Sequence, residues 1–159
     1  MQDTSSEQYQ IDASASELKI AIVAARYNSE IVNQLIDGAQ EALSSYRISA
    51  VQVWRVPGAF EIPLLCKSLA QTGKWDALVA LGCVIRGETS HYQHVCDAVT
   101  QGLSEVMLET LVPIGFGVLT TENLEQAKAR CSQNAGNKGA EAALTAIEIA
   151  QMLPKARER

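Results

Sequence analysis

One polar, glycine-bearing stretch of the chain combines groups that bind anions with a group that exchanges protons. It runs over residues 80–97 and reads A-L-G-C-V-I-R-G-E-T-S-H-Y-Q-H-V-C-D. An apolar segment leads into it, and Thr89, Ser90 and His91 lie where a helical pattern begins. Free backbone N–H groups at a helix start attract anions, and a histidine can carry a proton near neutral pH. The stretch therefore indicates phosphate binding beside a proton carrier.

The elements that must position this stretch alternate between apolar strands and amphipathic helices. Short apolar runs predict strands at residues 18–25, 50–56, 76–83 and 114–120. Helical spacing predicts helices over residues 29–43 with Ser29 as cap, 60–71, 90–111, 121 or 123 to 131, and 140–153 with Pro154 as the stop. Apolar strands that alternate with helices indicate a parallel sheet covered on both faces. We therefore predict an α/β fold, a single three-layer domain with a four-stranded parallel sheet.

Length, composition and charge limit the class of protein. The chain has 159 residues and a hydrophobic fraction of 47%, which suit one domain with a real core. No apolar run approaches the ~20 residues that span a bilayer, and a net charge of -5 argues against nucleic acid as the main partner. Residues 1–17 are polar and lack the pattern of a secretory signal. We expect a loose tail over 1–17 that a partner subunit could order, a domain over 18–154 and a charged end over 155–159.

The chain has four cysteines and two histidines, and their spacing does not match a zinc site. No two cysteines form a C-x-x-C pair, and each cysteine lies within an apolar pattern. We therefore expect no metal and buried free thiols in a reducing cytoplasm. The cysteines are Cys66, Cys83, Cys96 and Cys131.

The unusual residues of the chain collect where ligands of open parallel sheets bind, beyond the carboxyl ends of the strands. Tyr27 follows the first predicted strand, and residues 57–61, 86–91 and 120–122 follow the other three. Aromatic rings, glycine turns, a carboxylate and a histidine would thus meet at one end of the sheet. This placement is consistent with a site for a flat, polar molecule that carries phosphate.

The residues near the strand ends also have ordinary structural explanations. Tyr27 could only plug the end of the sheet, and Glu61 could only favour a helix N-terminus electrostatically. Thr89 and Ser90 could be simple caps. No single residue is specific for one function. The combination of these residues is a stronger indication, but it does not identify a reaction.

The histidines and the more distant candidates have similar alternatives. His91 could be a helix-start residue without function, and we interpret His94, one helical turn further on, as structural. Phe116 lies between two glycines and would ordinarily belong to the core. Arg130 and Lys138 would ordinarily be solvated surface charges.

Five stretches of the chain resemble the 6,7-dimethyl-8-ribityllumazine synthase family of riboflavin biosynthesis. They follow the family's order across almost the whole chain after about Leu18. Together, V-P-G-x-x-E, I-R-G-x-T and G-N-K-G are highly specific. The stretches are A-R-Y-N at 25–28, V-P-G-A-F-E-I-P at 56–63, A-L-G-C-V-I-R-G-E-T-S-H at 80–91, F-G-V-L-T-T-E-N-L-E-Q-A at 116–127 and G-N-K-G-A-E-A-A-L at 136–144.

The resemblance implies a flavodoxin-like sheet and a transferase that catalyses the penultimate step of riboflavin biosynthesis. It would condense 5-amino-6-(D-ribitylamino)uracil with 3,4-dihydroxy-2-butanone 4-phosphate. The products would be 6,7-dimethyl-8-ribityllumazine, phosphate and water. The family's enzymes need no metal and no organic cofactor, and we expect this chain to be cytoplasmic.

The resemblance also assigns residues around the pyrimidine substrate. Tyr27 matches the aromatic residue that stacks on the ring, and Glu61 matches the residue directed toward the ribityl chain. Two further segments match the substrate wall and the strand end whose backbone contacts the pyrimidine. These segments consist of Ala59, Phe60 and Glu61, and of Cys83, Val84 and Ile85.

The remaining assignments concern phosphate and proton transfer. Glu88 and Thr89 match the phosphate-binding turn, and His91 matches the proton-transfer residue. In the family the neighbouring subunit closes the site, and the residues of this chain that match its contribution are Phe116, Arg130 (phosphate contact) and Lys138.

The family implies a homopentamer that in some members assembles into an icosahedral shell, with possible association of riboflavin synthase. Residues 131–137 carry no insertion, so formation of an icosahedral shell stays possible. Three positions depart from the family's usual residues. Tyr27 replaces Phe or Trp and can still stack, Glu88 adds a carboxylate to the phosphate turn, and His94 replaces an aromatic residue.

Three other interpretations fit parts of the sequence. The archaeal type of riboflavin synthase shares the fold but consumes the lumazine, and V-P-G-A-F-E with I-R-G-E-T-S-H favours the synthase that makes it. A flavin-binding shell oligomer would show tight binding with little turnover. A phosphoreceiver domain shares the sheet topology, but it needs acidic residues after the first strand, where this chain has Arg26, Tyr27 and Asn28.

Overall fold

The protein is described by a computed structural model that covers residues 9–133 and 136–158. Residues 1–8 of the expected tail, 134–135 of the connection and 159 of the charged end lie outside the described residues. Four parallel strands form one sheet in the order β2-β1-β3-β4. The predicted sheet is confirmed, with β1 at Lys19–Ala25, β2 at Ala50–Val56, β3 at Ala77–Ile85 and β4 at Ile114–Thr121.

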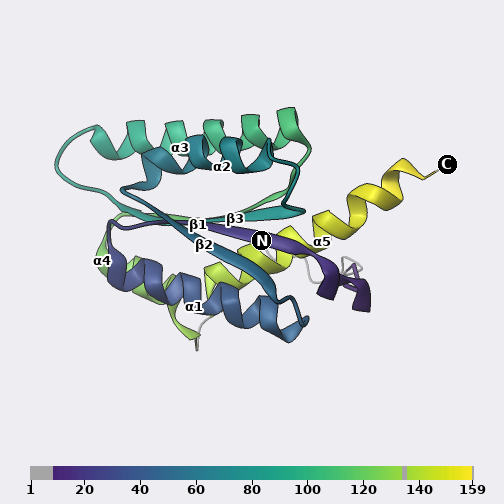
Figure 1. Ribbon diagram of the computed structural model, residues 1–159. Coiled ribbons are helices and arrows are strands. Elements are labelled where there is room, and N and C mark those ends of the chain that lie inside the picture. Colours follow the sequence, from purple (N-terminus) through teal and green to yellow (C-terminus); the bar gives the residue numbers. More distant parts are fainter. Residues whose placement is uncertain (1–8, 134–135, 159) are drawn as a thin grey trace.

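Helices cover both faces of the sheet, which confirms the three-layer α/β prediction (Figure 1). One layer consists of α2 (Ile62–Ala70) and α3 (His91–Thr110). The other layer consists of α1 (Ser29–Ser45), α4 (Leu124–Cys131) and α5 (Lys138–Arg157). Two short 3-10 helices precede β1 and α2, and they are η1 (Ala13–Glu17) and η2 (Ala59–Glu61).

The core consists of two hydrophobic clusters, one on each face of the sheet. Successive side chains of a strand point to opposite faces, so β1 supplies both clusters. Ile20 and Ile22 belong to the cluster under α1 and α5, and Ala21 and Val23 belong to the cluster under α2 and α3. Both faces of β1 are therefore apolar, as the continuous apolar run predicted.

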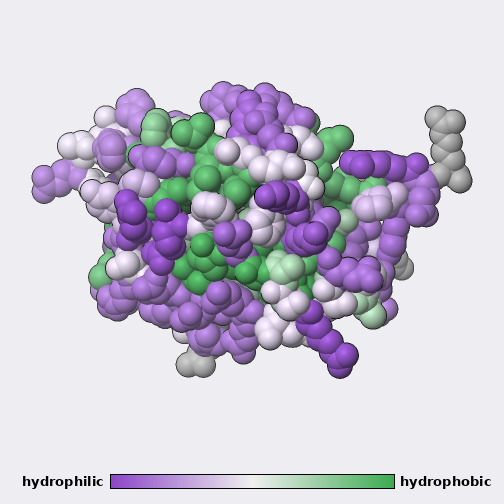
Figure 2. Space-filling model, viewed as in Figure 1, coloured by the Kyte–Doolittle hydropathy of each residue, from purple (hydrophilic) through white to green (hydrophobic). Residues whose placement is uncertain are grey.

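The sheet keeps an open edge at β2. Figure 2 shows hydrophobic residues across the middle of this side of the molecule, between the two helical layers. Trp54 of β2 remains 36% exposed. An edge strand presents unpaired backbone groups to solvent or to a partner.

In the part of the chain that the structure describes, no helix is both long and apolar enough to cross a membrane.

Two expected helix signals are wrong. Ser29 is the first residue of α1 and not its cap, because the cap position belongs to Asn28 in the left-handed conformation. Pro154 lies inside α5, which continues to Arg157. The lost N–H of a proline weakens a helix interior, but contacts with the N-terminal segment hold this last turn, because Lys155 Nζ donates to Asp12 Oδ2 at 3.2 Å.

The described residues 9–17 of the expected N-terminal tail contact α5 of their own chain. Asp12 caps η1, and its backbone N–H donates to Gln151 Oε1 at 3.1 Å. Gln151 Nε2 donates to Asp12 Oδ1 at 2.9 Å, and Ala15 is fully buried. The polar composition of the segment concealed these contacts, several of which are hydrogen bonds to Gln151 and Lys155 of α5.

Candidate active site

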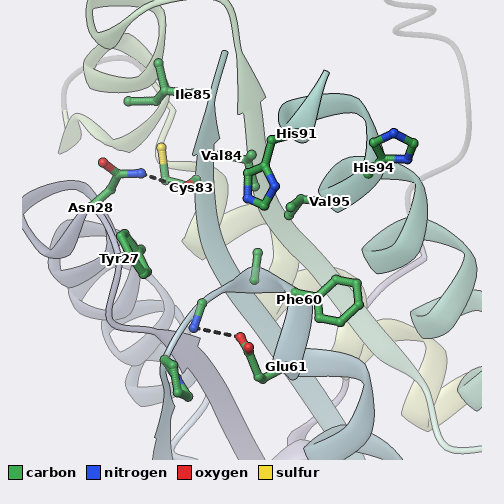
Figure 3. A pocket seen from close by; sticks show the side chains of 13 residues that line it. Tyr27, Asn28, Phe60, Glu61, Cys83, Val84, Ile85, His91, His94 and Val95 are labelled. Carbon is green, nitrogen blue, oxygen red and sulfur yellow. Dashed lines mark hydrogen bonds between the residues drawn. The ribbon is translucent and has the colours of Figure 1, made fainter. Parts of the chain in front are cut away.

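A cavity of about 710 Å³ lies beyond the carboxyl ends of β1, β2 and β3, beside the first turns of α3. This is the edge of the sheet at which the sequence placed the site. Figure 3 shows Tyr27 and Asn28 on one side, the histidines on the α3 side, and Phe60 and Glu61 on the η2 side. The lining residues are Tyr27, Asn28, Pro57, Gly58, Ala59, Phe60, Glu61, Cys83, Val84, Ile85, His91, His94 and Val95.

Two aromatic rings at this cavity are open to solvent. Tyr27 is 73% exposed and Phe60 is 61% exposed, although large aromatic side chains usually gain free energy from burial. The backbone N–H of Tyr27 donates to the Pro57 carbonyl at 3.1 Å, which holds the end of β1 against the turn after β2. The cavity therefore offers ring faces on a fixed backbone, suited to a planar ligand.

Asn28 joins the two central strands at the cavity wall. Its Nδ2 donates to the Cys83 carbonyl at 2.7 Å. The residue adopts φ 57° and ψ 47°, a conformation that asparagine tolerates better than most residues. Asn28 was not among the predicted site residues, although its position directly after a strand and beside Tyr27 indicated the site.

Glu61 has a structural contact within the cavity wall. Its Oε2 accepts a hydrogen bond from the backbone N–H of Gly58 at 2.9 Å, which closes the turn before α2 (Figure 3). The helix-start explanation of Glu61 is thus supported, and the same contact fixes the neighbouring Phe60. A role of this carboxylate toward a ribityl chain remains a prediction.

The end of β3 forms the floor between the aromatic and histidine walls. Cys83 is buried, while Val84 and Ile85 are half-buried. Burial raises the pKa of the Cys83 thiol to about 11, so the thiol stays neutral and is a poor nucleophile. Burial likewise raises the pKa of Cys66 to about 12. Cys66, Cys83, Cys96 and Cys131 are all free thiols, as expected, although Cys96 is only half-buried.

His91 begins α3, and its ring points into the cavity (Figure 3). Its backbone N–H donates to Thr89 Oγ1 at 3.3 Å, so Thr89 contributes to the helix start. His94 also lines the cavity, on the Phe60 side. The His94 ring lies apart from the His91 ring, beyond Val95, and the structural role expected for His94 remains a prediction.

The expected phosphate turn lies next to the cavity but does not line it. Residues 86–90 are exposed between β3 and α3. A Cβ added at Gly87 would meet no atom within 4 Å, so this turn is open to an incoming group. Glu88 and Thr89 are thus adjacent to His91 in the chain, and their phosphate role remains a prediction.

Three expected site residues lie away from this cavity. Phe116 of β4 is 48% exposed and lines a separate groove on the opposite flank of α3. Arg130 of α4 and Lys138 of α5 belong to the helical layer on the sheet face opposite α3. Arg130 Nη1 donates to the Gln126 carbonyl at 2.9 Å, and Lys138 Nζ pairs with Glu141 Oε2 at 2.8 Å. One copy of the chain therefore does not bring these three residues to the cavity.

Asn137 fixes the segment that carries Lys138. Its Oδ1 accepts from the N–H groups of Gly139 and Ala140, and its Nδ2 donates to the carbonyls of Gln34 and Cys131. A Cβ at Gly38 would approach Asn137 Oδ1 to 2.2 Å, so the amide packs directly on α1. Within the G-N-K-G motif, Asn137 is thus a buried junction of α1, α4 and α5.

Within the described residues, no group of three or more His, Cys, Asp or Glu side chains is arranged to hold a metal ion.

Comparison with known protein families gives one match. The family model described as 6,7-dimethyl-8-ribityllumazine synthase matches residues 17–154 of the chain. The matched region includes all four strands, the cavity, the turn after β3 and the Asn137 junction. The match thus covers nearly all of the 159 residues, and the chain belongs to the 6,7-dimethyl-8-ribityllumazine synthase family.

Proposed function

We propose that this protein condenses 5-amino-6-(D-ribitylamino)uracil with 3,4-dihydroxy-2-butanone 4-phosphate to give 6,7-dimethyl-8-ribityllumazine, phosphate and water. The observation that carries the proposal is the placement of the exposed Tyr27 ring and the His91 imidazole around one cavity of about 710 Å³. A planar substrate can stack on the tyrosine while its amine reacts beside the histidine. Membership of the family supports this reaction.

The reaction consists of bond changes that a proton carrier assists. The pyrimidine amine adds to the ketone of the second substrate, and loss of water leaves an imine. Removal of a proton from the sugar-derived carbons then expels phosphate. After tautomerisation, the ribityl-bearing nitrogen adds to the remaining carbonyl, and a second loss of water closes the ring. Each dehydration needs a proton delivered to a leaving hydroxyl, which suits a histidine.

Orientation of the substrates contributes alongside proton transfer. Holding two reactants in register removes much of the entropy cost of a bimolecular step. The stacking face of Tyr27 and the strand end of β3 would hold the pyrimidine, and the turn before His91 would receive the phosphate. Backbone N–H groups in such a turn suit a dianion. We expect the reaction to continue slowly without His91.

The location of the other predicted residues supports a ring of subunits. The cavity lies on one flank of α3, and Phe116 lies on the opposite flank. If both flanks form one site, adjacent copies must meet head to tail, and such interfaces form a ring when the rotation between copies closes. We propose that Phe116, Arg130 and Lys138 of each copy complete the cavity of the next copy in a homopentamer. This arrangement leaves icosahedral assembly and association with riboflavin synthase open.

Two experiments test the proposal. Purified protein mixed with both substrates should form the lumazine chromophore faster than the spontaneous reaction. Mixed oligomers of His91→Ala and Arg130→Ala subunits should be more active than either variant alone, because some interfaces then contain both native residues. A mixture no more active than its components would contradict the shared site while leaving the reaction itself untouched.

A further inference from the structure

The guanidinium of Arg86 connects three elements next to the cavity, although Arg86 does not line it. Arg86 follows the last residue of β3, and its backbone N–H donates to the Thr121 carbonyl at 2.9 Å, which extends the pairing with β4. Its Nε donates to Glu122 Oε2 at 2.6 Å. Its Cζ lies 4.3 Å from the ring centroid of Tyr92, in the first turn of α3.

These contacts close a short loop on itself. Residues 87–91 lie between Arg86 and Tyr92, so the guanidinium and the aromatic ring meet at the neck of the loop. Tyr92 is only 9% exposed, and it anchors the start of α3 in the protein. A cation over an aromatic face contributes more when the contact is partly shielded from water. The loop contains His91 and the two residues expected to bind phosphate, Glu88 and Thr89.

Glu122 is itself fixed, which gives the loop a firm support. Its backbone N–H donates to Gln126 Oε1 at 2.9 Å, at the start of α4. The carboxylate also raises the pKa of Arg86, consistent with a charge-assisted hydrogen bond. The guanidinium thus has one partner on the β4–α4 connection and one on α3.

We propose that Arg86 is a positioning residue for the phosphorylated substrate: by binding Glu122 and Tyr92 it holds residues 87–91 in the shape that presents backbone N–H groups and His91 to one ligand. This inference rests on the proposed function, since it concerns the same site. It also separates Arg86 from Arg130, for which a direct phosphate contact is predicted.

The competing explanation is that Arg86 leaves Glu122 and binds phosphate directly. The two explanations predict opposite effects of Glu122→Gln. Loss of the carboxylate would loosen a positioning residue, and the KM for the butanone phosphate should rise by about tenfold. If Arg86 instead binds phosphate directly, Glu122→Gln would release the guanidinium for that contact, and the KM for the butanone phosphate should fall. Arg86→Gln should raise this KM in either case, so Glu122→Gln is the decisive variant.

Tyr92 and a remote ion pair supply the controls. Tyr92→Leu removes the ring that contacts the guanidinium and should resemble Glu122→Gln, whereas Tyr92→Phe keeps the ring and should raise the KM for the butanone phosphate less than Tyr92→Leu does. Lys67 and Glu109 form an ion pair at 2.9 Å between α2 and α3 with similar exposure, so Glu109→Gln is a matched control that should leave both KM values unchanged. Steady-state kinetics with each substrate varied in turn should show a rise in KM for the butanone phosphate and not for the pyrimidine.

A fall in the KM for the butanone phosphate in Glu122→Gln would overturn the proposal, as would equal changes for both substrates or no change. If the wild type forms no lumazine, the proposed function fails and a second readout still tests Arg86. Amide hydrogen exchange at residues 87–91 should be faster in Glu122→Gln than in the wild type or Glu109→Gln. Unchanged exchange at these amides would show that Arg86 does not position the loop.

Discussion

The side-chain amide of Asn28 donates a hydrogen bond of 2.7 Å to the backbone carbonyl of Cys83. This bond ties the residue after β1 to the end of β3 and so fixes two walls of the cavity relative to one another. It occupies a carbonyl of the strand end that was expected to meet the pyrimidine. The Asn28 amide thus uses one of the two lone pairs of this carbonyl and leaves one for a ligand.

Variants of Asn28 should separate its hydrogen bond from its backbone conformation. Asn28→Asp tolerates the left-handed conformation but places an acceptor opposite the Cys83 carbonyl, and we expect a loss of about 1–3 kcal/mol in the free energy of unfolding. Asn28→Gly accepts the same conformation without the repulsion and should lose less. Urea denaturation measures both. An aspartate variant as stable as the wild type would contradict a structural role for this bond.

The exposed ring of Tyr27 should matter for binding and not for folding. Tyr27→Phe retains the stacking face and should bind the pyrimidine product as the wild type does. Tyr27→Ala should weaken binding by about 1–3 kcal/mol, the range for loss of base–aromatic stacking. Because the side chain is 73% exposed, both variants should unfold at the wild-type temperature. Calorimetric titration with the lumazine checks the prediction, and undiminished binding by Tyr27→Ala would refute it.

The two histidines of the cavity should not contribute equally. His91 begins α3 with its ring directed inward, so His91→Ala should slow single-turnover formation of the product by about 10²-fold without abolishing it. His94→Phe, which introduces the aromatic residue that is usual in the family at this position, should retain most of the activity. Rapid-mixing absorbance measures both variants. A slower His94→Phe than His91→Ala would transfer the proton-carrier role to His94.

Acid should weaken the contact between the N-terminal segment and α5. Hydrogen bonds from the Ser14 hydroxyl and backbone, followed by Lys155, lower the pKa of Asp12 from an ordinary 3.8 to about 2. The unfolded chain therefore takes up this proton before the folded chain does, and the stabilising contribution disappears as the pH falls from about 4 to about 2. Melting temperatures across this range should fall more steeply for the wild type than for Asp12→Asn. Parallel curves would contradict the assignment.

The fold was predictable from the sequence because its strands are continuous apolar runs and its helices have clear periodicity. The cavity edge followed from the rule for parallel sheets, and Tyr27, Phe60 and His91 all line it. Long-range hydrogen bonds were not predictable. Asn28 bonds to a residue 55 positions away, and Asp12 to one 139 positions away. Such partners depend on packing, which residue types and spacing do not encode locally.

The strand that carries Phe116 was predictable from the sequence, but the flank of α3 that Phe116 faces was not. Its sequence neighbours predict a strand, and the strand is present as β4. Which flank of α3 it faces depends on the order of the strands in the sheet. The family resemblance had already assigned Phe116, Arg130 and Lys138 to the neighbouring subunit, and their position outside the cavity of one copy is consistent with that assignment.

The most direct test of the account measures product and phosphate together. Purified protein is mixed rapidly with 5-amino-6-(D-ribitylamino)uracil and 3,4-dihydroxy-2-butanone 4-phosphate, and lumazine absorbance is recorded with phosphate release. We predict that both products appear in equal amounts, well above the spontaneous rate, and that His91→Ala slows both alike. No increase over the spontaneous rate, or consumption of added lumazine to give riboflavin, would contradict the central claim.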